Sequence, residues 1–271
     1  MALPTFAAES PAEVKACCAT AYETPWAKML MGDTFHPGGL PLTLHLGDLL
    51  GLTRDTRLLD VACGRGTSAI ALAKEFGCTV VGVDLGEESI RAAREAARAE
   101  GLEGRVSFRS GDAEALPVDD SSFDAIICEC AFCTFPSKES AAAEFARVLR
   151  PGGALGVSDI TREGPLPPEL ETLLGWVACL ADARPLADYE AIFSGAGLLA
   201  VRSERHDETV GDLARSVKFR LLGAEVLAKL GKGPVPLEEV LEAKRIVKAA
   251  AATAKDGRLG YAVIVGTTPG E

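Results

Sequence analysis

The chain has 271 residues, of which 48% are hydrophobic and 25% are charged, so it can bury a substantial core and is too apolar to remain disordered. Its formal charge of -11 at pH 7 opposes sequence-independent binding to nucleic acid, which depends on cationic side chains. No apolar run approaches the ~18 residues of a membrane span, and the N-terminus lacks the pattern of a signal or transit peptide. We therefore expect a cytoplasmic protein with reduced thiols that binds neither nucleic acid nor membrane.

Helices are predicted in the first part of the chain. A capping box with proline at the first helical position, followed by apolar residues at helical spacing, predicts an amphipathic helix over Pro11–Tyr22. A loop rich in glycine and proline, Gly32–Pro41, leads to a second predicted helix, Leu42–Leu50. We group residues 1–52 as an N-terminal helical cap.

From residue 53 the pattern changes to strands that alternate with helices. Strands are predicted at Thr56–Ala62, Cys78–Asp84, Val106–Ser110, Phe123–Cys130 and Ala154–Asp159, and helices at Thr67–Phe76, Glu87–Glu100 and Ser137–Leu149. Such alternation implies right-handed crossovers and a parallel sheet that is covered by helices on both faces.

The last third of the chain is mainly helical and ends in a strand. Helices are predicted at Pro168–Ala183, Leu186–Ala196, about Thr209–Leu230 and Leu237–Ala254, and strands at Leu199–Arg205 and Tyr261–Gly266. Because the closing apolar, β-branched run must return to the sheet, the helices just before it indicate an insertion at about 207–256. We predict one α/β domain over 53–271: a doubly wound, mostly parallel, seven-stranded sheet of the Rossmann-like type.

A glycine loop lies between the first predicted strand and its helix, in "LLDVACGRGTSAIAL". Glycine lets a ligand approach the backbone, and the helix N-terminus offers unpaired N–H donors. Asp84 ends the second strand, where a carboxylate can accept hydrogen bonds from two ribose hydroxyls, and Asp112 follows the third strand, where it suits an exocyclic amine. These positions all lie at the carboxyl ends of strands, where open α/β sheets bind ligands.

These motifs resemble those of the class I S-adenosylmethionine-dependent methyltransferases over roughly Leu58–Asp159. "LDVACGRGT" is similar to the first motif of that family, and "VLRPGGALGVSD" is similar to a later one. The resemblance implies S-adenosyl-L-methionine as the cofactor and a last strand that is antiparallel and inserted beside its neighbour. It also implies that the following residues surround the cofactor: Asp60, Ala62, Gly64, Gly66, Asp84, Leu85, Asp112, Ala113 and Glu129.

Three of the eight cysteines lie close together in "ICECAFCTFP". Cys128 and Cys130 are expected on one face of the fourth strand, and the family fold would then place Cys130 and Cys133 near the methyl group of the cofactor. A buried free cysteine usually packs as a small hydrophobe, and this is our interpretation of Cys63 and Cys78.

The thiol positions resemble one branch of the family, the arsenite methyltransferases. The segment "DAIICECAFCTFPSK" is similar to theirs, with Cys130 at the matching position, and "PLPPELETLLGWVACLADARPL" places Cys179 at another. That branch also uses cysteines before the cofactor loop, for which Cys17 and Cys18 are the candidates. The resemblance implies a metalloid substrate held by Cys130, Cys179 and Cys18, further catalytic candidates in Cys17 and Cys133, and a thiol reductant as a partner.

The chemistry of trivalent arsenic is consistent with this resemblance. Arsenic is thiophilic, and three sulfur ligands leave its lone pair free to attack a methyl group. Ligation also removes the thiol protons, so that a separate general base is not required.

Two alternatives stay open from the sequence. The protein can be a methyltransferase for a small organic acceptor such as a quinone, phenol or polyketide, or the C-x-C-x-x-C motif and Cys179 can form a closed zinc–thiolate structural site. The sequence fixes neither the number of methyl groups transferred nor the oligomeric state. His36 either covers the cofactor or stabilises a turn, and His45 and His206 are expected at the surface or at the edge of the core.

Overall fold

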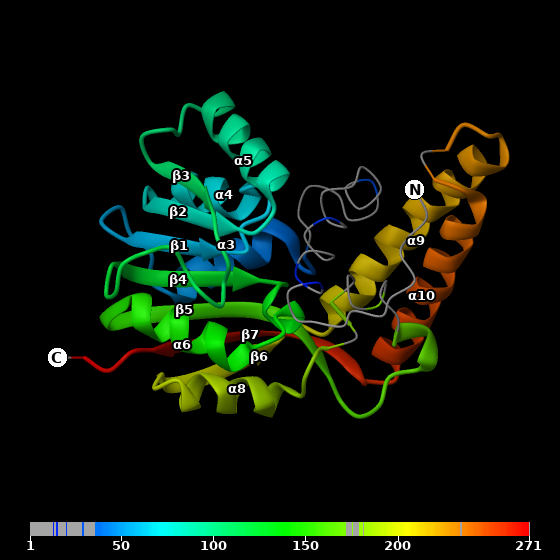
Figure 1. Ribbon diagram of the computed structural model, residues 1–271. Helices are drawn as coiled ribbons and strands as arrows, with labels where there is room; N and C mark the ends of the chain where they lie inside the picture. The colour runs from blue at the N-terminus through cyan, green and yellow to red at the C-terminus, as the bar shows by residue number, and fades with distance from the viewer. Residues whose placement is uncertain are drawn as a thin grey trace.

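The computed structural model describes residues 36–171, 175, 179–180, 182–233 and 235–270, together with 13, 15, 20 and 29. Its centre is a seven-stranded sheet with helices on both faces (Figure 1). The strands are β1 Arg57–Val61, β2 Thr79–Asp84, β3 Val106–Ser110, β4 Phe123–Glu129, β5 Leu149–Arg162, β6 Leu199–Arg205 and β7 Leu259–Thr267. The helices are α3 Gly39–Leu49, α4 Thr67–Phe76, α5 Glu87–Ala99, α6 Lys138–Val148, α8 Leu186–Gly195, α9 Glu208–Lys229 and α10 Leu237–Lys255, with short 3-10 helices η1 Phe132–Thr134 and η2 Pro168–Leu170.

The strand order is β3-β2-β1-β4-β5-β7-β6. Strands β1 to β5 pair in parallel, and β7 pairs antiparallel with both β5 and β6. The structure therefore confirms the predicted doubly wound, mostly parallel sheet, with the last strand inserted beside its neighbour. Strand order reverses between β1 and β4, and because crossovers are right-handed, α4 and α5 cover one face while α6 covers the other.

The burial of individual residues distinguishes the inner strands of the sheet from an edge strand. Leu58–Val61 of β1 and Leu259–Gly266 of β7 are buried at every residue, as expected for strands that are covered on both faces. The edge strand β6 is mostly exposed. Helix α3 packs on β5, where Gly156 leaves room for Leu46: a Cβ atom at Gly156 would lie 2.7 Å from Leu46 Cδ1.

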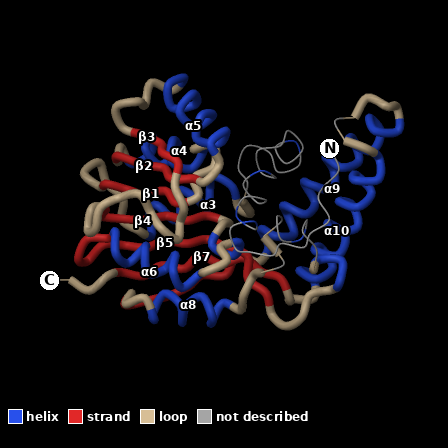
Figure 2. Tube along the Cα trace, viewed as in Figure 1, coloured by secondary structure: helices blue, strands red, loops and turns tan. Residues whose placement is uncertain are grey.

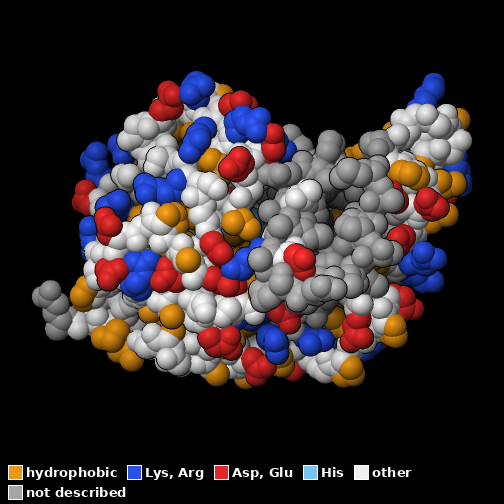
Figure 3. Space-filling view, in the orientation of Figure 1, with side chains coloured by type: hydrophobic (Ala, Val, Ile, Leu, Met, Phe, Trp, Pro, Cys, Tyr) orange, Lys and Arg blue, Asp and Glu red, His pale blue; other side chains and the backbone are white. Residues whose placement is uncertain are grey.

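Helices α9 and α10 come between β6 and β7 in the sequence, and they form a pair that extends away from the sheet (Figure 2). A small core of their own joins the two helices, and it consists of Val217, Leu221, Ala224, Val240 and Ala243. Phe219 of α9 and Leu230, which follows the helix, remain exposed, and hydrophobic side chains show on the surface of the pair in Figure 3. None of the helices in the described part of the chain is both long enough and apolar enough to cross a bilayer.

Only part of the predicted N-terminal cap falls within the described residues. Helix α3 covers most of the second predicted helix, and in the first the structure describes Glu13, Lys15 and Thr20, which have helical backbone. The division into a cap (1–52) and a domain (53–271) with an insertion stays a prediction.

Two predicted elements end earlier than expected. The helix predicted over Pro168–Ala183 begins as the short η2, and Cys179 has a φ of 61°, a left-handed conformation that an α-helix excludes. Strand β4 ends at Glu129, and Cys130 has a φ of 51°. The expected placement of Cys128 and Cys130 on one face is therefore wrong: Cys128 is fully buried in the core, whereas Cys130 is partly exposed.

The contact between β2 and β3 leaves no room for an added methyl group at Gly82, where a Cβ atom would lie 2.4 Å from Phe108 Cδ1 and 2.8 Å from Cys63 Sγ. Because overpacking strains a filled core, we expect Gly82→Ala to lower the free energy of unfolding by about 1–3 kcal/mol, measured by equilibrium urea denaturation. Gly104→Ala is the matched control, since a Cβ atom there has no atom within 4 Å and neither glycine has a left-handed φ. Equal losses in the two variants would contradict this account.

Candidate functional site

A pocket opens at the carboxyl ends of β1, β2, β3 and β4, where the strand order reverses. Open α/β sheets bind ligands at this position. Of the residues predicted to surround the cofactor, all but Gly66 line the pocket: Asp60, Ala62, Gly64, Asp84, Leu85, Asp112, Ala113 and Glu129. The fold thus brings these side chains together, and their roles as cofactor ligands stay predictions.

The loop after β1 presents its backbone to the pocket. Ala62, Gly64 and Gly66 all have left-handed φ angles, of 58°, 51° and 78°. A Cβ atom at Gly64 would point into open space, so this glycine keeps the backbone accessible to a ligand. Gly66 was predicted to lie beside the cofactor, but it does not line the pocket. A Cβ atom at Gly66 would lie 2.4 Å from Phe108 Cζ, so this glycine lets α4 pack against β3.

Hydrogen bonds fix the two carboxylates that follow β2 and β3. Asp84 accepts a backbone N–H at each carboxylate oxygen, one from Gly64 and one from Gly86, both at 2.8 Å. Asp112 accepts the Glu114 N–H at 2.9 Å. Lys15 Nζ donates to Asp112 at 2.7 Å and to Glu114 at 2.6 Å, which places a cation at the pocket wall. A carboxylate oxygen has two lone pairs, so these bonds orient the acceptors and leave capacity for a ligand.

Asp60 is a buried carboxylate with an unpaired oxygen. The residue is 2% exposed, lines the pocket, and its Oδ2 has no hydrogen-bond partner in the described structure. Burial raises the pKa of Asp60 well above its usual value, and the negative charges of Glu129 and Asp84 raise it further. A cation bound in the pocket would stabilise the ionised carboxylate. The site therefore fits a ligand that carries an ammonium group, as the amino-acid part of S-adenosyl-L-methionine does.

Glu129, at the end of β4, lies among hydroxyl groups from three other elements. Ser68 Oγ of α4 donates to it at 2.6 Å, Thr43 Oγ1 of α3 at 3.1 Å and Ser158 Oγ of β5 at 3.4 Å. His36 Nε2 lies 3.7 Å from Glu129 Oε2, and His36 also lines the pocket. These contacts hold the Glu129 carboxyl group in place at the wall of the pocket.

Three thiols from two separate parts of the chain converge next to this pocket. Cys130 follows β4, Cys133 lies in η1, and Cys179 lies in a turn that comes later in the chain. The Cys179 thiol donates to Cys130 O at 3.1 Å and also interacts with the thiols of Cys130 and Cys133. Cys130 lines the pocket, whereas Cys133 and Cys179 are buried. The three sulfurs are not all within 4.8 Å of one another, so they adjoin without forming a closed three-sulfur site.

The surroundings of the thiols oppose their ionisation. The Cys179 thiol and burial raise the pKa of Cys130 well above its usual value, and burial and the Cys179 thiol do the same for Cys133. Asp159, in the last part of β5 and before its end at Arg162, accepts the Cys133 N–H at 2.8 Å and the Ile160 N–H at 2.7 Å. Burial raises the pKa of Asp159 to about 7. A proton acceptor that titrates near neutrality therefore lies beside the thiols.

The other cysteines agree with their predicted roles to different degrees. Cys17 and Cys18 lie outside the described residues. Cys78 is fully buried, in agreement with its expected packing role, whereas Cys63 is largely buried but also lines the pocket. The four thiols of the zinc alternative do not come together within the described residues as a closed zinc site requires.

Asp159, Thr43 and Ser68 are missing from the predicted site. Asp159 ends the "VSD" of the later family motif, and an acidic residue at the carboxyl end of a buried strand is the signal that marks it. Thr43 and Ser68 carry no comparable signal, because their contact with Glu129 arises only when α3 and α4 pack beside β4.

Comparison with known proteins identifies relatives of the chain. Residues 52–190 match the family model of a methyltransferase domain. The chain is 37% identical over 169 residues to the methyltransferase GfsG of Streptomyces halstedii, a match that covers 61% of each chain. It is 34% identical over 158 residues to an arsenite methyltransferase of Halobacterium salinarum, which covers 56% of this chain and 39% of that one. Other relatives at 31–38% identity are named as oxygen- or carbon-directed methyltransferases.

These matches cover no more than 61% of the length of the named relatives. A solved structure with a similar fold is the phosphoethanolamine N-methyltransferase 2 of Haemonchus contortus in complex with S-adenosyl-L-methionine, with a TM-score of 0.79 and 19% identity over 94% of this chain and 60% of that one. At this identity the likeness shows the fold alone.

The contact between Cys179 and Cys130 can be tested by alkylation. Because the Cys179 thiol raises the pKa of Cys130, we expect iodoacetamide to modify Cys130 slowly at neutral pH, with a rate that still rises above pH ~9. In Cys179→Ala the midpoint of this pH–rate curve should shift downward, as followed by fragment mass spectrometry of the labelled peptide. Cys78→Ala, which removes a distant buried thiol, should leave the midpoint unchanged. A wild-type midpoint at or below ~8.5 would disprove the raised pKa.

Proposed function

The chain belongs to the methyltransferase domain family, and we propose that it transfers a methyl group from S-adenosyl-L-methionine to a soft metalloid bound by its thiols, arsenite first. The observation that carries this proposal is the convergence of Cys130, Cys133 and Cys179 at the end of β4, next to the pocket. The similarity to an arsenite methyltransferase supports the same acceptor.

The residues that line the pocket suit this cofactor. When bound, S-adenosyl-L-methionine supplies a methyl group on a positively charged sulfur, so the protein need not protonate a leaving group. Asp60 would hold the ammonium group, Asp84 the ribose hydroxyls and Asp112 the amino group of the base. Each of these carboxylates comes from a different strand or the loop after it, and Asp84 and Asp112 are already oriented by backbone N–H groups.

The thiols and Asp159 provide the chemistry for the metalloid. Each sulfur–arsenic bond forms as one thiol proton and one hydroxide group of arsenite leave together as water. Burial keeps the free thiols protonated, so the proton must leave when the metalloid binds. Asp159, with a pKa raised to about 7 and a hydrogen bond from the Cys133 N–H, is placed to take that proton near neutral pH and pass it to the departing hydroxide group, so that water leaves and Asp159 is unchanged at the end.

The sulfurs have to close in around the metalloid, because they are not preformed as a set within 4.8 Å. Cys130 and Cys179 themselves have left-handed backbone, and the Cys179 thiol donates to Cys130 O, so the two residues meet from different segments. Cys18 or Cys17 stays the proposed further thiol. A thiol reductant would keep these cysteines reduced between turnovers.

Single substitutions at the thiols test the proposal. We expect wild-type protein with arsenite, thiol reductant and S-adenosyl-L-methionine to form methylated arsenic, and Cys130→Ser and Cys179→Ser each to lower kcat by about 100-fold or more, since a misplaced acceptor costs at least that much. Chromatography with arsenic detection measures the product. Cys78→Ala is the control and should keep wild-type turnover, because Cys78 is buried away from the pocket. Undiminished turnover in both serine variants would overturn the metalloid proposal.

A small organic acceptor is the competing function, favoured by the relatives named as oxygen- and carbon-directed methyltransferases and by His36, which lies beside Glu129 in the pocket. The two functions separate in one assay. Methyl transfer to a phenol, quinone or polyketide from a panel, with no transfer to arsenite and no effect of Cys179→Ser, would establish the organic acceptor.

The role of Asp60 is testable by binding alone. We expect Asp60→Asn to weaken S-adenosyl-L-methionine binding about 10–100-fold in calorimetry, because a hydrogen bond between charged partners contributes about 1.5–3 kcal/mol. The free energy of unfolding without ligand should not fall, since a buried amide costs less than a buried carboxylate. Asp119→Asn, at an exposed site outside the pocket, should bind as the wild type does. Unchanged affinity in Asp60→Asn would remove the residue from the cofactor site.

A further inference from the structure

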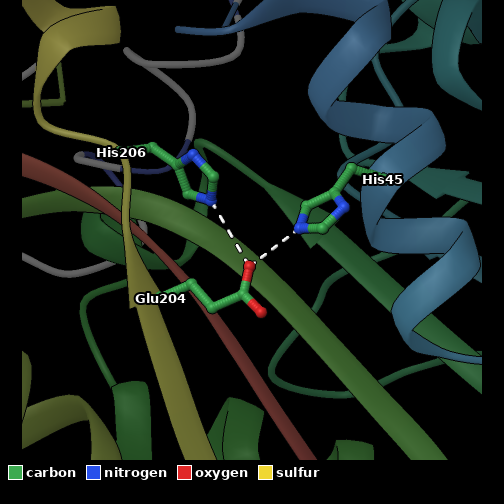
Figure 4. Close-up of side chains that lie close together, drawn as sticks. All are labelled: His45, Glu204 and His206. Carbon is green, nitrogen blue, oxygen red and sulfur yellow. Dashed lines mark hydrogen bonds and ion pairs between the residues drawn. The ribbon is translucent and has the colours of Figure 1, made fainter.

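Two imidazoles and a carboxylate lie close together outside the pocket (Figure 4). His45 comes from α3, Glu204 from β6, and His206 follows directly after β6. Their ligand atoms all lie within 4.8 Å of one another, and within the described residues this is the one set of three or more His, Cys, Asp or Glu side chains that does so.

The two imidazoles point at the same carboxylate oxygen. His45 Nε2 lies 2.8 Å from Glu204 Oε2, and His206 Nε2 lies 3.6 Å from it (Figure 4). His206 Nε2 is buried and has no hydrogen-bond partner among the described residues, which is costly for a polar atom unless a ligand satisfies it. A metal ion could bind between this unpaired imidazole nitrogen and the carboxylate that it faces.

We propose that His45, Glu204 and His206 bind a divalent metal ion of the zinc type. Two imidazoles and one carboxylate are a donor set that Zn²⁺ takes in proteins, with a fourth position for water. Donor atoms at tetrahedral Zn²⁺ lie about 3.3 Å apart, given bonds of about 2.0–2.2 Å. The His206–Glu204 separation of 3.6 Å is close to that value, and the His45–Glu204 separation of 2.8 Å must open by about 0.5 Å. The side chains of His45 and Glu204 are 41% and 44% exposed, so they have room to move and an ion can reach them.

The second nitrogen of His206 supports this assignment. His206 Nδ1 lies 3.9 Å from Glu208 Oε1, which is longer than a hydrogen bond, so the exposed Glu208 side chain has to move closer before it can orient the ring as a carboxylate behind a ligating imidazole does. With the proton on Nδ1, Nε2 is free to bind the ion. A backbone hydrogen bond also anchors His206, because its N–H donates to Tyr261 O of β7 at 2.7 Å.

The ion would join α3 to the exposed edge of the sheet. Strand β6 leads directly into α9, and α3 supplies Thr43, which donates to Glu129 in the pocket. A ligand that binds only the folded arrangement stabilises it. Metal binding would therefore strengthen the link between α3 and β6 that the His45–Glu204 hydrogen bond makes.

Titration with Co²⁺ tests the site directly on the full chain, freed of any purification tag and stripped of metal with a chelator. We expect one Co²⁺ per chain, with visible d–d absorption of a nitrogen and oxygen donor set and without the near-ultraviolet band of a cobalt–thiolate bond. Zn²⁺ should displace the Co²⁺, and hydrogen exchange of the α3 amides should slow when metal is bound. A cobalt–thiolate band that is lost in Cys130→Ser would locate the ion at the thiols and overturn the proposal.

Substitutions decide which residues bind the ion. His45→Gln, His206→Gln and Glu204→Gln should each weaken Zn²⁺ binding by at least about 100-fold, and Glu208→Gln by about 10-fold, as measured by competition calorimetry. Glu163→Gln, at another exposed carboxylate, should bind Zn²⁺ as the wild type does. The unfolding midpoint of each variant shows that it is folded, and if one of the three ligand variants unfolds, the other two decide. Wild-type affinity in the ligand variants, or no Co²⁺ spectrum at millimolar metal, would overturn the site.

Discussion

A carboxylate buried at the end of β4 has to be satisfied by hydrogen bonds, because an unpaired buried charge is costly. Glu129 receives these bonds from Thr43 of α3, Ser68 of α4 and Ser158 of β5. Three elements that are separate in sequence therefore have to meet at one point. This point lies where the strand order reverses, so the same requirement positions the base of the pocket and the start of the turn that carries Cys130.

The proposed active site divides into two halves with different construction. The cofactor half is made of residues at the ends of parallel strands, and backbone N–H groups orient its carboxylates at Asp84 and Asp112. The acceptor half is made of turns, since Cys130 and Cys179 have left-handed backbone and Cys133 lies in a single 3-10 turn. Strand ends give a fixed arrangement, because the sheet holds them in register. Turns can differ from one relative to the next, which agrees with the varied acceptors in the names of the relatives.

Helix α3 connects the pocket to the edge of the sheet. It contributes Thr43 to the network around Glu129 and His45 to the cluster with Glu204 and His206. Its packing on β5 depends on Gly156, which leaves room for Leu46. A bound ion at the proposed metal site would act on the same helix, so the position of Thr43 beside Glu129 and the position of β6 would depend on each other.

The pattern of the amino-acid sequence was enough to predict the parallel sheet and the position of the pocket, and the resemblance to the methyltransferase family added the inserted last strand. Apolar strands that alternate with amphipathic helices allow few arrangements, and the glycine loop and strand-end acids identify the ligand edge of such a sheet. The side-chain partners, in contrast, depend on how the elements pack in three dimensions. The turn at Cys130 breaks the strand alternation from which one face was expected for Cys128 and Cys130, and Gly66 faces Phe108 instead of the pocket. The meeting of His45 with Glu204 depends on the packing of α3 against the sheet edge, and no local pattern encodes a contact between residues so far apart in the chain.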